Sequence, residues 1–152
     1  MALSFREDVD TRVVIFTGAD KHFSSGFDPT DPSTEYEGML ILRRRRNRVK
    51  ARAITALYGV DQITIAAWNG AAMGGGACIP TTFDFRIGSE SCVMRYPEVD
   101  LGMNLMWHSL PLCVHLVGPT RAKRIVVGGE SITAPTLLGG GGTLTRLLSM
   151  NS

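Results

Sequence analysis

The chain has 152 residues, of which 44% are hydrophobic and 20% are charged, and its formal net charge is +2. This length fits a single domain over residues 1–152, and the composition is typical of a soluble globular protein. The small net charge does not by itself indicate a nucleic acid or an anionic membrane as a partner. No run of about 18 apolar residues is present, so no membrane span is expected.

Three cysteines, Cys78, Cys92 and Cys113, form no CxxC motif and have no histidine at zinc spacing. Their odd number, and an N-terminus that does not resemble a secretory signal, favour free thiols in a reducing, cytoplasmic compartment. We therefore expect no metal site.

The first half of the chain alternates apolar runs with polar segments. Residues 12–17 (RVVIFT) form a β-branched run that predicts a buried strand. The stretch 23–32 is rich in Ser, Gly, Asp and Pro and predicts a loop. A long helix is expected over 35–58, followed by a second strand over 62–68 (QITIAAW).

In the second half, the glycines at 74–76 predict a tight turn that leads into a short helix. Short strands are expected over 83–87 and 91–95, and helices over 105–117 and 119–127. The repeated order of strand, loop and helix predicts an α/β protein with helices packed on a sheet.

The C-terminal segment contains four consecutive glycines at positions 139–142. Ordering such a run costs much conformational entropy. We therefore expect residues 135–152 to form a tail that is flexible or docks only weakly.

Two glycine-containing loops, 24–28 and 69–76, each follow a predicted strand. Glycine lets a ligand approach the backbone closely, and a helix that begins there directs free N–H groups toward an anion. A tight turn that binds nothing is the competing interpretation when the GGG run is taken alone.

The order of these blocks resembles the enoyl-CoA hydratase/isomerase (crotonase) superfamily from residue 12 to about residue 134. In chain order the blocks are RVVIFTG, HFSSGFD, TIAAWNG, AAMGGGA, FDFRIGSESC, YPEVDLG and VGPTRAKRIVVGGESITA. The resemblance implies an α/β fold of the ClpP/crotonase type, in which ββα turns stack as a spiral. Because members of the family are usually longer, this chain is expected to be truncated at both ends.

The same resemblance implies an acyl-CoA thioester as the ligand, with coenzyme A as part of the substrate and no separate cofactor. It implies a homo-oligomer, either a trimer or a hexamer. It also implies an oxyanion hole, formed by the backbone N–H groups of Phe27 and Gly75, that binds the thioester carbonyl oxygen. The candidates for substrate or CoA binding around it are Lys21, Ser25, Gly26, Asp28, Gly74, Gly76, Met106 and Trp107.

Hydratases of the family use two glutamates, and this chain has Cys78 at the first position and Glu98 at the second. A thiol with a reference pKa of about 8.5 replaces a carboxylate poorly at neutral pH, so we expect Cys78 to pack as a small apolar residue. Shifting a double bond needs only one group that takes a proton and returns it. Glu98 alone therefore favours isomerisation, or another reaction that needs one base, over hydration. Asp100 and His108 are candidate accessory groups, although the sequence favours structural or solvated roles for both.

In the family, a glycine-rich segment usually follows the block that matches YPEVDLG, and this chain has large side chains there instead. Met106 and Trp107 stand in this region and predict a narrower, more apolar pocket.

The basic stretch 43–52 holds seven of the sixteen Lys and Arg residues. Three interpretations of this stretch are open: a solvated helix, attraction of the CoA phosphates, and RNA binding. RNA binding is the least supported, because no aromatic residues are interleaved with the basic ones. Three functions stay open: an acyl-CoA isomerase-like or hydratase-like enzyme, a non-catalytic member that binds CoA esters or only oligomerises, and an RNA-binding module.

Overall fold

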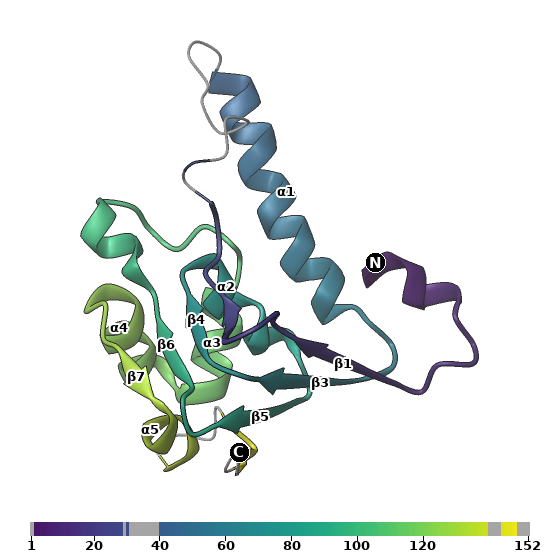
Figure 1. The fold of residues 1–152 in the computed structure, drawn as a ribbon. Coiled ribbons are helices and arrows are strands. Elements are labelled where there is room, and N and C mark those ends of the chain that lie inside the picture. Colours follow the sequence, from purple (N-terminus) through teal and green to yellow (C-terminus); the bar gives the residue numbers. More distant parts are fainter. Residues whose placement is uncertain (1, 29, 31–39, 140–143, 149–152) are drawn as a thin grey trace.

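The structure is a computed structural model that describes residues 2–28, 30, 40–139 and 144–148 (Figure 1). Its helices are η1 (Ala2–Glu7), α1 (Leu40–Tyr58), α2 (Gly75–Cys78), η3 (Pro80–Thr82), η4 (Pro97–Leu101), α3 (Leu110–Val117), α4 (Pro119–Val127) and α5 (Ala134–Gly139), where η marks a 3-10 helix. Its strands are β1 (Val13–Thr17), β2 (His22–Ser24), β3 (Ile63–Trp68), β4 (Ala71–Met73), β5 (Phe85–Ser89), β6 (Val93–Arg95), β7 (Ile132–Thr133) and β8 (Arg146–Leu148).

The strands form two four-stranded sheets. One sheet has the order β1-β3-β5-β8 and is parallel throughout. The other has the order β2-β4-β6-β7, in which only β7 runs antiparallel to its neighbour. In Figure 1 the strands β1, β3 and β5 cross the view, whereas β4, β6 and β7 run roughly perpendicular to them.

Each turn of the chain adds one strand to the first sheet, one to the second sheet, and then a helix. The successive turns are β1-β2-α1, β3-β4-α2 and β5-β6-α3, with η3 following α2 and η4 preceding α3. The equivalent strands of successive turns pair with one another, as in Val13 opposite Ile63 and Ile65 opposite Phe85. This spiral of stacked ββα turns confirms the fold expected from the sequence.

The core lies between the two sheets and the helices. The largest fully buried side chains are Trp68, Tyr96, Ile54, Met94, Ile125 and Leu137. Removing each such side chain from water stabilises the fold by about 1.5–3 kcal/mol. None of the described helices is long and apolar enough to cross a membrane.

The predicted strands over 12–17 and 62–68 and the predicted helix over 119–127 are confirmed as β1, β3 and α4. The strand predicted over 83–87 is found two residues further on, as β5, and the strand predicted over 91–95 is found as the shorter β6, which ends at the same residue. The predicted loop 23–32 in fact begins inside a strand, β2. Of the helix expected over 35–58, the structure describes the part from Leu40, and residues 35–39 lie outside the described residues.

The helix predicted over 105–117 begins only at Leu110. Ser109 precedes it, and its carbonyl accepts the Cys113 N–H at 2.8 Å. Pro111 stands in the first turn, where its missing N–H costs no hydrogen bond. His108 has a positive φ of 59°, which a helix interior does not allow. Segment 105–109 is therefore irregular.

The structure describes two parts of the segment 135–152, for which the sequence predicts a flexible or weakly docked tail. Residues 134–139 form α5, and β8 pairs with β5 in parallel. Leu137 and Leu144 are buried in the core, and the Leu144 N–H donates to the Leu137 carbonyl at 3.0 Å. The glycines at 140–142 lie outside the described residues.

Candidate active site

Two glycine loops lie side by side because the strands that precede them are neighbours. β2 and β4 pair in parallel, so the loops that follow their carboxyl ends emerge at the same edge of the sheet. A Cβ atom placed on Gly26 would lie 2.9 Å from the nitrogens of both Gly75 and Gly76. Gly26 also has a φ of 85°, which side chains disfavour. Both the conformation and the close approach therefore require glycine at position 26.

This arrangement brings the two predicted oxyanion-hole residues onto adjoining loops. Phe27 follows Gly26 directly, and Gly75 is the first residue of α2. An N–H group in the first turn of a helix has no acceptor within that helix, so it is available to a ligand.

Glu98 lies beside the second glycine loop. Its side chain rises from the first turn of η4, and Oε1 lies 3.2 Å from the position that a Cβ on Gly74 would occupy. Oε2 is buried and has no hydrogen-bond partner among the described residues. Burial raises the pKa of the Glu98 carboxyl above its ordinary value of 4.5. A carboxyl group with a raised pKa next to convergent backbone groups is typical of proton-transfer sites.

Cys78 is part of the hydrophobic core, which confirms that it packs as a small apolar residue. The Ser109 hydroxyl donates to its sulfur at 3.0 Å, and the thiol points toward the Gly74 carbonyl at 3.6 Å. Burial raises the pKa of the Cys78 thiol to about 12. The thiol therefore stays protonated at neutral pH and is not a second proton-transfer group.

Trp107 lies directly against Gly75. A Cβ on Gly75 would stand 2.2 Å from Cζ2 of the indole, so any side chain there would overlap the ring. Trp107 is partly buried and packs on the core. A large aromatic ring thus occupies space next to the predicted oxyanion hole.

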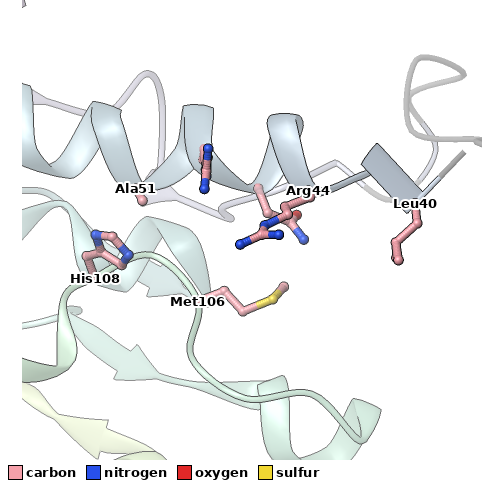
Figure 2. Close-up of a pocket in the computed structure, with 7 residues that line it drawn as sticks. Leu40, Arg44, Ala51, Met106 and His108 are labelled. Atoms are coloured by element: carbon pink, nitrogen blue, oxygen red, sulfur yellow. The ribbon is translucent and has the colours of Figure 1, made fainter. Parts of the chain in front are cut away.

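The two neighbours of Trp107 face the helix α1. Met106 and His108 line a hollow together with Leu40, Arg44 and Ala51 of that helix (Figure 2). His108 is exposed and lies on the irregular segment, not on the helix expected from the sequence.

Asp100 is engaged in a structural contact. Its carboxylate pairs with the Arg95 guanidinium at 2.6 Å, and the same guanidinium donates to the Gly129 carbonyl at 2.8 Å. These contacts tie η4 to the loop before β7. Asp100 therefore has a partner other than Glu98.

The remaining predicted residues lie around the first glycine loop. Lys21 and Ser25 are exposed, and the carboxylate of Asp28 accepts the Thr30 N–H at 2.8 Å within the loop. The ring of Phe27 is exposed on one side, and the Lys50 ammonium lies 3.8 Å from its centre. This contact joins the loop to α1 by a cation–π interaction.

Sequence reasoning did not single out Ser109, which contacts Cys78, or Lys50 as the partner of Phe27. Lys50 belongs to the basic stretch, but its contact with Phe27 depends on how α1 packs. Nothing local distinguishes Ser109 from other serines. The described residues contain no group of three or more His, Cys, Asp or Glu side chains arranged to hold a metal ion.

Two stacked sheets of ββα turns, with two glycine loops converging beside a partly buried glutamate, define a protein of the crotonase class. The sequence profile of the enoyl-CoA hydratase/isomerase family matches residues 2–141, so the chain belongs to that family.

Individual relatives agree with this assignment. The chain is 33% identical over 132 residues to a probable enoyl-CoA hydratase of Mycobacterium leprae (strain TN), covering 84% of this chain and 45% of that protein. It is 31% identical over 133 residues to the peroxisomal Delta(3,5)-Delta(2,4)-dienoyl-CoA isomerase of Arabidopsis thaliana, covering 82% and 48%. The solved enoyl-CoA hydratase of Bacillus anthracis superposes with a TM-score of 0.88 at 28% identity, covering 97% and 56%. The chain thus spans about half the length of the relatives it matches.

Proposed function

We propose that this chain binds an acyl-CoA thioester with the carbonyl oxygen at the N–H groups of Phe27 and Gly75, and that Glu98 moves one proton beside it. The observation that carries this proposal is the position of Glu98. Its carboxyl has a raised pKa, one oxygen without a partner among the described residues, and a place against Gly74, next to Gly75.

The reaction that these groups support best is the shift of a double bond. The Glu98 carboxylate takes a proton from C2 of a 3-enoyl thioester, and the electron pair moves toward the carbonyl oxygen. The two N–H groups stabilise the resulting enolate. The protonated Glu98 then returns the proton to C4, which gives the 2-enoyl thioester without net gain or loss of atoms.

Hydration of a 2-enoyl thioester is less well supported. It requires a water molecule to be positioned and deprotonated while a proton is delivered to carbon, which two carboxylates do readily. Here the thiol of Cys78, with its pKa raised to about 12, stands in place of one of them. Trp107 also fills space next to Gly75 where a water molecule would need room.

The test is turnover of 3-hexenoyl-CoA, followed by the absorbance of the conjugated 2-enoyl product. Glu98→Gln keeps the shape of the side chain and removes its base, so we expect kcat to fall by about 100-fold or more. Glu90→Gln, at an exposed turn between β5 and β6, is the matched control and keeps full activity. Binding of the thioester to Glu98→Gln is measured by calorimetry and stays near the wild-type level. Full turnover by Glu98→Gln would refute the proposal.

We also propose that the chain assembles with copies of itself. The support is one face of the parallel sheet, where Val13, Ile15, Ile63 and Phe85 expose large apolar side chains. The strand register places all four on the same face. An apolar patch of this kind is typical of an interaction surface.

A further inference from the structure

A hollow of about 520 Å³ lies between α1 and the irregular segment before α3 (Figure 2). Its lining residues are Leu40, Arg44, Asn47, Arg48, Ala51, Met106 and His108. This volume lies within the range of roughly 300–1,000 Å³ that is typical of small-molecule sites. The hollow is therefore large enough for part of a ligand.

The polar lining of the hollow is cationic or neutral. Arg44 and Arg48 stand one helical turn apart on α1, so their side chains lie on the same face of the helix. Figure 2 shows the imidazole of His108 on the opposite wall, facing α1. No lining residue is acidic, and no described carboxylate lies within ion-pair distance of either arginine. A guanidinium group matches the planar geometry of a carboxylate or a phosphate, so the hollow fits an anionic group.

The hollow and the proposed thioester site share one segment of the chain, residues 106–108. Met106 and His108 flank Trp107, whose indole lies against Gly75. The segment 106–108 therefore has residues facing the hollow and a residue packed on the proposed thioester site.

We propose that this hollow binds a carboxylate at the far end of the acyl group, so that the preferred ligands are CoA thioesters of short dicarboxylic acids. The inference rests on the proposed thioester function. Arg44 and Arg48 pair with the carboxylate, and the apolar side chains of Ala51 and Met106 contact the methylene groups. The phosphates of CoA offer similar chemistry, but the long pantetheine arm separates them from the thioester.

Calorimetric titrations with four probes test this assignment: glutaryl-CoA, butanoyl-CoA, free CoA and free glutarate. Glutaryl-CoA and butanoyl-CoA differ mainly in the terminal carboxylate. The variants are Arg44→Met and Arg48→Met, which keep the length of the side chain without its charge. Arg52→Met is the matched control, because Arg52 is exposed on the same helix and does not line the hollow.

We expect the wild-type chain to bind glutaryl-CoA about tenfold or more tightly than butanoyl-CoA, which is the size of effect that one charged hydrogen bond gives. Arg44→Met and Arg48→Met lose most of this preference and keep their affinity for butanoyl-CoA, whereas Arg52→Met retains the preference. Circular dichroism checks that each variant is folded.

The outcomes separate this inference from the proposed function. Equal binding of the two thioesters by the wild-type chain overturns the inference alone. A uniform loss of affinity for all three CoA compounds in the arginine variants assigns the arginines to the CoA phosphates and also overturns it. Glutarate binding that depends on Arg44, without binding of any thioester, rejects the proposed function and supports the anion site. Binding of none of the four probes contradicts both.

Discussion

The contact between Trp107 and Gly75 gives a sharp test of the site geometry. An alanine Cβ at position 75 would lie 2.2, 2.4 and 2.6 Å from three atoms of the indole ring. These separations are far below van der Waals contact, so Gly75→Ala must displace the ring or the loop. Overpacking of this kind costs about 1–3 kcal/mol of unfolding free energy.

Removing the indole removes the clash. In a Trp107→Ala background, we expect Gly75→Ala to cost little, so that the double-mutant cycle yields a coupling energy of about 1–3 kcal/mol. The measurement is urea denaturation of the four proteins, followed by far-ultraviolet circular dichroism. Gly139→Ala is the control, because a Cβ there meets open space. If Gly75→Ala is equally destabilising with and without Trp107, the indole does not lie against Gly75, and the prediction that it narrows the pocket is refuted.

Three further predictions concern protons, thiols and assembly. Because burial raises the pKa of Glu98 above 4.5, folding favours its protonated form, and the free energy of unfolding falls as pH rises from that value through the folded-state pKa. Thermal melts between about pH 4 and pH 8 should show this fall in the wild type. The part of the fall that comes from Glu98 should be absent in Glu98→Gln. Turnover by the wild type should rise with pH over the same interval, because the carboxylate is the base. All three cysteines are free and buried, with the pKa raised to about 12 at Cys78 and about 11 at Cys113, so a thiol reagent at neutral pH should modify them rapidly only after unfolding. Light scattering should report an oligomer that Ile15→Lys dissociates; a wild-type monomer would end that proposal.

The sequence predicts best the elements whose pattern is local. The apolar runs at 12–17 and 62–68 each fill one strand, and Pro119 marks the first turn of α4. The close approach of the two glycine loops is also predictable, because the strands before them are neighbours in the fold that the sequence resembles. For Gly26, the structure adds the reason that no other residue fits.

Tertiary contacts decide the features that the sequence does not predict. The apolar spacing from residue 105 onward favours a helix, but Trp107 packs on Gly75 and His108 takes a positive φ, so the helix starts late. The burial of Leu137 and Leu144, which lie on either side of the glycine run, also has no local sequence pattern that predicts it. Likewise, the basic stretch does not reveal which arginines line the same hollow as His108, because that depends on how α1 packs against segment 105–109.

The central claim is that Glu98 moves a proton at C2 of a thioester held by the two glycine loops. Exchange of the C2 protons of butanoyl-CoA in D₂O, followed by proton NMR, tests it most directly, because this compound has no double bond to shift. We predict that the wild-type chain exchanges these protons well above the buffer rate and that Glu98→Gln returns the rate to that of buffer. Exchange that persists in Glu98→Gln would contradict the claim.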